Sequence, residues 1–155
     1  MNREQDSNLS IVQSLAAVNL TINNTTVAGG AIDLQGFDSA TVCVDIGTWA
    51  DTVAGGMMEF AVQHSDDTVS GNFVDVPNAD LTDTVTLTST VTGGAATGGF
   101  AKVTGTSDDV KVVKTGYKGG KRYIRHKING EKNLASGTPV SITVIKGNPH
   151  VAPTS

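Results

Sequence analysis

The side chains with the most chemical potential are concentrated in residues 116–128, the most basic stretch of an otherwise acidic chain. Basic and aromatic residues interleave there: Tyr117, Lys118, Lys121, Arg122, Tyr123, Arg125 and Lys127. This mixture suits either nucleic acid, whose bases stack on aromatic rings, or a protein surface, where Arg and Tyr are frequent anchors. Because the rest of the chain is acidic and repels a polyanion, we predict a protein interface, with His150 as a further member. A solvated sheet face without a partner is the remaining alternative.

No arrangement typical of catalysis or of metal binding is visible in the sequence. His64, His126 and His150 are scattered, and Cys43 has no second cysteine with which to share a metal or a disulfide. The Asp66-Asp67 pair lacks the spaced oxygen ligands of a calcium loop. A Gly-x-Ser-x-Gly motif, a phosphate-binding loop and a dinucleotide fingerprint are all missing. We therefore expect a protein that is not an enzyme and that uses no metal or cofactor.

The formal net charge of −4 hides an asymmetry between the two parts of the chain. Residues 1–110 hold two basic residues against fourteen acidic ones, whereas residues 111–155 hold nine basic residues against Glu131 alone. Two outcomes remain open, because the regions can attract as separate surfaces or can be mixed in space by an antiparallel sheet. No apolar run is long enough to span a membrane and the amino terminus lacks an apolar signal core, so we expect synthesis in the cytoplasm and no membrane partner.

The basic stretch requires an element that positions it, and the sequence predicts a β-hairpin. Gly119-Gly120 reads as a tight turn between residues 110–115 and a strand over residues 123–128. Alternation along that second strand places Ile124, His126 and Ile128 on one face and Tyr123, Arg125 and Lys127 on the other.

The remaining chain also reads as short strands separated by turns. The clearest strand has Ala40, Val42, Val44 and Ile46 on one face, and Trp49 at its exit is predicted to cover the core. Further strands are indicated at residues 58–62, 72–76, 85–88 and 140–145, with a break at 129–133 and a surface loop at 90–99. The pattern predicts an all-β protein, a jelly-roll-like antiparallel β-sandwich of about eight strands. We expect one sandwich domain over 11–145, a flexible or partner-bound arm over 1–10, and an extended tail over 146–155.

Several segments resemble a family of structural proteins of tailed bacteriophages. The most specific are the Gly-Tyr-x-Gly-x-Lys-Arg-Tyr-x-Arg pattern of residues 116–125 and the Pro-His-x-Ala-Pro ending of residues 149–153; residues 32–40 and 44–49 also fit. The resemblance implies a head decoration, or cement, protein with a jelly-roll fold and no catalytic residues. Such proteins bind the major capsid protein on the capsid surface of the virion, as dimers or trimers, after synthesis in the host bacterium. Residues 82–106 depart from the family because they are longer than expected.

Two other functions remain open at this point. A neck or tail component is one. The other is a carbohydrate- or host-binding module on the virion, for which Trp49 or Tyr117 in an open groove would be the expected platform.

Overall fold

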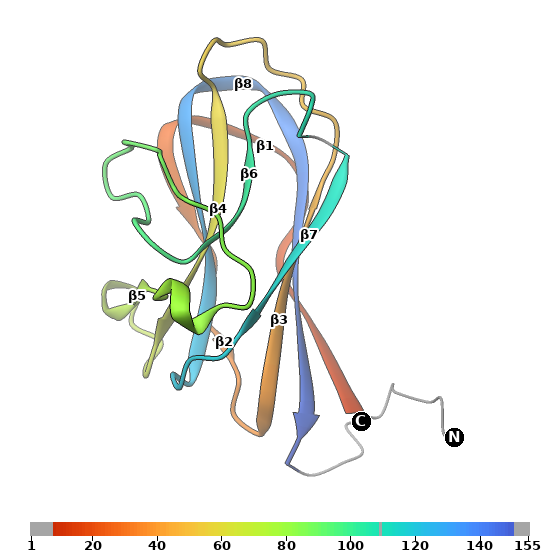
Figure 1. The fold of residues 1–155 in the computed structure, drawn as a ribbon, viewed down its shortest axis with the longest axis vertical. Helices are drawn as coiled ribbons and strands as arrows, with labels where there is room; N and C mark the ends of the chain where they lie inside the picture. Colours follow the sequence, from red (N-terminus) through yellow and green to blue (C-terminus); the bar gives the residue numbers. More distant parts are fainter. Residues whose placement is uncertain (1–7, 109, 151–155) are drawn as a thin grey trace.

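The computed structural model describes residues 8–108 and 110–150 and contains eight β-strands in one antiparallel sheet (Figure 1). The strands are β1 (Leu9–Ala28), β2 (Ile32–Asp33), β3 (Phe37–Ile46), β4 (Met57–Ser65), β5 (Val74–Asp75), β6 (Gly99–Val103), β7 (Lys111–Tyr117) and β8 (Tyr123–Pro149). The short 3-10 turns Ser70–Asn72 and Asn78–Asp80 flank β5. The predicted all-β antiparallel class with about eight strands is thus confirmed. Within the described residues, no helix is long and apolar enough to cross a membrane.

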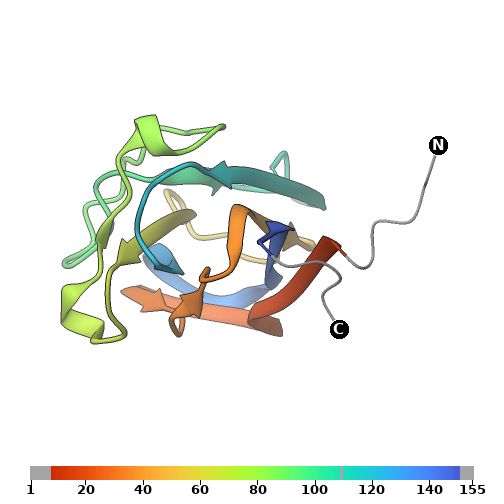
Figure 2. The same cartoon turned by 90° about the horizontal axis from the view of Figure 1, so that it is seen from below.

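The two longest strands, β1 and β8, run through both halves of the sheet. They pair with each other from Leu9 opposite Gly147 to Ala28 opposite Lys127. The first part of β8 also pairs with β4, which in turn carries β5 and β6. The last part of β8 pairs with β3, and β3 carries β7. The sheet therefore curls over on itself, and its two halves face each other like the layers of a sandwich (Figures 1 and 2).

The core lies between these two halves and is built from alternate residues of each strand. Every member of the predicted inward face of β3 is less than 5 % exposed. Opposite them lie the following fully buried side chains: Phe60 and Val62 of β4, and Ile124 and Ile128 of β8. Trp49 is also buried, as expected of a side chain that covers the core. Burying each of these large apolar side chains contributes roughly 1.5–3 kcal/mol.

The predicted break at residues 129–133 is wrong, because β8 continues through it. The turn-forming residues there bend the strand instead of ending it: Lys132 and Gly137 both have positive φ, at 68° and 75°. The bend is held by the buried carboxylate of Asp51, which accepts the backbone N–H of Ser136 at 3.2 Å and that of Gly137 at 3.0 Å. This bend lets one strand contribute to both layers.

The predicted hairpin at Gly119-Gly120 is also wrong. Strand β7 pairs with β3 along Ala40–Ile46, and the start of β8 pairs with β4 and β2. The connection over residues 118–122 therefore crosses from one layer to the other. Alternation of side chains identifies a strand but does not identify its neighbour, and the sequence could not show that β3 was the better partner for β7.

Residues 82–98 contain no strand, contrary to the alternation seen at 85–88. Backbone N–H groups of this segment donate hydrogen bonds to side chains on the sheet, whereas in a strand they would donate to the backbone of a neighbouring strand. Glu59 accepts the N–H groups of Thr88 and Ser89, and Asn129 exchanges hydrogen bonds with both backbone groups of Ala95. The predicted surface loop at 90–99 ends at β6, which begins at Gly99.

The sheet extends into both of the predicted terminal segments, since β1 begins at Leu9 and β8 ends at Pro149. The remainder of the predicted arm, residues 1–7, and of the predicted tail, residues 151–155, lies outside the described residues.

Candidate functional site

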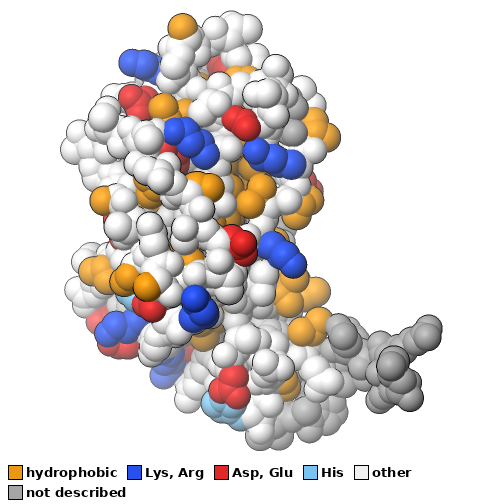
Figure 3. Space-filling model, in the orientation of Figure 1, with side chains coloured by type: hydrophobic (Ala, Val, Ile, Leu, Met, Phe, Trp, Pro, Cys, Tyr) orange, Lys and Arg blue, Asp and Glu red, His pale blue; other side chains and the backbone are white. Residues whose placement is uncertain are grey.

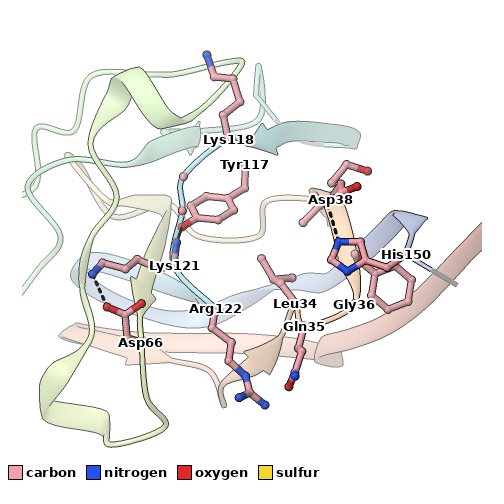
Figure 4. A pocket seen from close by; sticks show the side chains of 15 residues that line it. Leu34, Gln35, Gly36, Asp38, Asp66, Tyr117, Lys118, Lys121, Arg122 and His150 are labelled. Carbon is pink, nitrogen blue, oxygen red and sulfur yellow. Dashed lines mark hydrogen bonds and ion pairs between the residues drawn. The ribbon is translucent and has the colours of Figure 1, made fainter.

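The structure brings five of the eight predicted interface residues together around one open hollow of about 520 Å³ (Figure 4). The five are Tyr117, Lys118, Lys121, Arg122 and His150. They come from the end of β7, from the crossing connection and from the residue after β8. Residues 34–40, which are the connection after β2 and the first residues of β3, form the opposite wall, and Asp66 completes the rim. We call this surface the crossing hollow.

Tyr117 forms a support for the crossing connection. Its ring is 7 % exposed, and its hydroxyl lies 3.1 Å from the backbone N of Lys121 and 3.0 Å from Nδ1 of His64. Because the Lys121 N–H donates to the hydroxyl oxygen, the hydroxyl proton is available for Nδ1 of His64. A Cβ at Gly119 would clash with the Tyr117 ring, so the chain can wrap the ring this closely only with glycine there. Burial raises the pKa of Tyr117 and lowers that of His64.

Two ion pairs and one histidine–carboxylate hydrogen bond surround the crossing hollow, and each joins a residue late in the sequence to an acid early in the sequence. Arg122 donates to both carboxylate oxygens of Asp33, with Nε–Oδ1 at 3.0 Å and Nη2–Oδ2 at 2.7 Å, and this contact holds the pKa of Asp33 below its usual value. The others are Lys121 with Asp66, and Nε2 of His150 with Oδ1 of Asp38 at 2.6 Å. The acidic and basic regions of the sequence are thus mixed in space, and Figure 3 shows both signs interspersed on one face.

Lys118 differs from the other cations around the crossing hollow. Its backbone N–H donates to the carbonyl oxygen of Asp80 at 2.7 Å, which fixes the start of the connection. Its side chain is exposed, points away from the hollow in Figure 4, and makes no ion pair with the described residues. An exposed cation that makes no ion pair within its own chain is available to a partner's carboxylate at little desolvation cost.

The other three predicted interface residues lie outside the crossing hollow, and Arg125 is internal. Its side chain is 9 % exposed and its guanidinium donates to Oε1 of Gln63 at 2.9 Å and to Oγ and O of Ser70 at 3.0 and 3.2 Å. It also lies 4.3 Å from the centre of the Phe73 ring. Burial lowers the pKa of Arg125. This residue ties the 70–73 segment to β8.

Tyr123 and Lys127, on the same strand as Arg125, are half-buried. The guanidinium of Arg122 lies 4.9 Å from the centre of the Tyr123 ring, so this pair forms a continuous patch next to the hollow. Sequence alternation placed Tyr123, Arg125 and Lys127 together on the face opposite Ile124, but the segment that follows β4 covers part of that face through the contacts of Arg125 with Ser70 and Phe73.

A second polar contact, which the sequence reasoning missed, lies inside the sandwich. Oγ of Ser14 is 2.7 Å from Nδ1 of His126, although 112 residues separate them. His126 is 3 % exposed, its Nε2 has no partner among the described residues, and burial lowers its pKa to about 4. A Cβ at Gly29 would overlap the imidazole, so the ring has no room beside it for a substrate. The pair therefore joins β1 to β8 in the interior.

The geometry offers binding groups more readily than reacting ones. No group of three or more His, Cys, Asp or Glu side chains suited to a metal occurs in residues 8–108 and 110–150. Burial raises the pKa of the half-buried Cys43 thiol, which disfavours the reactive thiolate. Trp49 is 5 % exposed and so offers no stacking platform. The acidic partners Asp33 and Asp38 were not singled out in the sequence, since nothing there shows that these carboxylates contact residues 89 and 112 positions away.

This sequence matches no protein-family model and no curated protein.

Proposed function

We propose that this chain is a non-enzymatic structural protein of a tailed-phage virion, a decoration protein that binds the outside of the major capsid protein shell and stabilises the head. The resemblance of residues 116–125 and 149–153 to such proteins supports this role. The structural observation that carries it is the crossing hollow, where the exposed cations Lys121 and Arg122 lie with His150, which follows the far end of β8. The same arrangement suits contact with an acidic protein surface better than turnover of a substrate.

The contact surface that we propose consists of Lys118, Lys121, Arg122 and His150. Three of these are held in place by their own acidic neighbours, so little side-chain entropy is lost when a partner arrives. Lys118 supplies the attraction that is not already satisfied within the chain. We leave Arg125 out of this surface because its guanidinium is committed to Gln63 and Ser70.

A single contact of this size is weak, and repetition over a symmetric shell compensates for it. Each copy bound next to another gains from a high effective concentration. We therefore propose two partners for this chain, the major capsid protein and further copies of itself as a homodimer or homotrimer.

The test is binding of the purified protein to shells that lack it, with occupancy measured by quantitative gel analysis and by electron microscopy of the particles. Lys118→Glu reverses an exposed charge and should reduce occupancy several-fold at limiting protein. Lys132→Glu is the matched control, since Lys132 is also exposed but lies in the bend of β8, outside the crossing hollow. Equal occupancy of the two variants, or density located away from the shell, would contradict the proposal. Reversing Arg125 would be a poorer test, because it would unpair buried groups and affect folding.

A further inference from the structure

The outer edge of β1 is the longest unpaired edge among the described strands. Along its whole length β1 pairs with β8 alone. Figure 2 shows β1 at the margin of the sheet, with β8 on one side and no strand beyond it. An unpaired edge presents backbone donors and acceptors that can pair with another strand.

Of the features that normally prevent such pairing, this edge has register shifts between Gln13 and Val18 but no charged side chain and no proline. Residues 7–32 contain no Asp, Glu, Lys, Arg, His or Pro, although proteins commonly place charges and prolines on edge strands to prevent association. Ile11 is 69 % exposed and Val18 is 43 % exposed. The part of β1 over residues 10–19 therefore combines an open backbone with apolar and neutral side chains.

The other edges of the sheet are protected, which makes the exposure of β1 specific. Strand β7 carries Lys111 and Lys114, and its end is covered by residues 80–82 through a bridge between Leu81 and Tyr117 and a hydrogen bond from the Thr82 N–H to the Gly116 carbonyl oxygen at 2.9 Å. The start of the β6 edge is covered by residue 85, because the Val85 N–H donates to the Gly99 carbonyl oxygen at 2.9 Å. Strands β2 and β5 are two residues long.

We propose that a second copy of this chain pairs with β1 along residues 10–19, antiparallel and about a two-fold axis, so that the two sheets continue into each other. Two-fold pairing places a strand opposite its own sequence, where like charges would repel. Because this stretch is uncharged, no such repulsion arises in any register, and Ile11 and Val18 lose exposed apolar area. The second copy presents the same open β1 edge, which has the same length as the edge it pairs with.

The pairing is self-limiting. Each copy has one such edge, and a two-fold interface consumes it on both copies, so the assembly closes as a dimer. Register shifts between Gln13 and Leu15 and between Leu15 and Val18 bend β1 and restrict the straight part that a partner can follow. The inference deepens the self-association named under the proposed function and rests on that part of it, but it does not depend on shell binding.

The register of β1 against β1 of the second copy can be measured with spin labels. Cys43 is the only cysteine, so in a Cys43→Ser background a single cysteine can be introduced and labelled at each chosen position. Labels would be placed at the exposed positions Ile11, Gln13, Ala17 and Thr21, and distances between the two copies measured by pulsed electron resonance. For an antiparallel two-fold pair the distance should pass through a minimum between residues 10 and 19 and rise by about 7 Å per residue on either side, twice the rise of one strand. The proposal would be overturned if the distance between copies had no minimum within β1. It would also be overturned if a label at Val112 on β7 gave a shorter distance than any label on β1.

Charge placed on the edge should separate the two copies. Ile11→Lys combined with Gln13→Lys puts like charges opposite each other and should raise the dimer dissociation constant at least tenfold in sedimentation experiments. Val112→Lys, at a residue that is also 69 % exposed but lies on β7, should leave the dimer dissociation constant unchanged.

A monomeric parent protein at about 100 µM, or equal effects of both variants, would also overturn the proposal. Shell binding by a monomeric protein would remove this inference alone, whereas a dimer that binds no shell would remove the proposed function alone.

Discussion

At the scale of single residues, the interior position of His126 makes the stability of this protein depend on pH. Burial lowers the pKa of His126 from 6.5 to about 4, with a smaller contribution from the charge of Arg125. The folded state therefore holds the imidazole neutral over a range in which the unfolded chain binds a proton. The contribution of the neutral His126 to the free energy of unfolding is fully present above pH 6.5. It is lost as the pH falls from 6.5 towards 4, by about 3 kcal/mol in total.

The measurement is urea unfolding at several pH values between 7.5 and 4.5. His126→Asn keeps an acceptor for the Ser14 hydroxyl but cannot be protonated, so its free energy of unfolding should fall less steeply over this range. His64, whose pKa burial also lowers, contributes in the same direction, and His64→Asn serves as the comparison. Parallel pH profiles for the parent and His126→Asn would show that the imidazole is not the group responsible.

At the scale of elements, one buried carboxylate holds the 82–98 segment against β4. Glu59 is 0 % exposed and accepts the N–H groups of Thr88 and Ser89 at 2.7 and 3.1 Å, with Nζ of Lys102 at 3.3 Å. Burial raises the pKa of Glu59, but these contacts outweigh burial and hold the pKa below 4.5. Since the folded state favours the charged form, this contribution is present above pH 4.5 and is lost as the pH falls through the lower folded value.

Glu59→Gln should therefore loosen this segment while leaving the sheet intact. We expect a loss of about 1–3 kcal/mol, the usual cost of weakening buried charge-assisted hydrogen bonds, and faster hydrogen exchange at Thr88 and Ser89. Hydrogen exchange followed by mass spectrometry resolves the two regions. Glu131→Gln is the control, because Glu131 accepts from Thr90 at a more exposed position and should have a smaller effect. Acceleration throughout β4 and β8 would instead indicate that Glu59 supports the whole sheet.

At the scale of the whole molecule, the sequence was informative about strands and uninformative about neighbours. Alternation identified the inward face of β3 and the strand at 58–62 correctly because it depends on local burial, but it also indicated a strand at 85–88 that the structure does not contain. It failed at the bend of β8 and at Gly119-Gly120, where the same turn-forming residues can end a strand, bend it or lead it into the opposite layer. Five of the eight predicted interface residues met because they are close in sequence or follow β8, whereas the burial of Arg125 depended on residues that lie 55 to 62 positions away.

The same long-range pairing predicts that the two layers unfold together. The β1–β8 pair accounts for more long-range neighbours than any other pair of strands and belongs to both layers, so neither layer keeps its core when the other opens. Urea unfolding followed by Trp49 fluorescence, which reports on the end of the molecule near Gly56, should therefore coincide with unfolding followed by far-ultraviolet circular dichroism.

Refolding should take milliseconds to seconds, because β1 must find a partner about 100 residues or more away in the sequence. Asp51→Asn removes the charge that holds the bend of β8 and should shift both transitions equally. Separation of the two curves in the parent protein would mean that each layer is stable by itself and that the shared strands do not couple them.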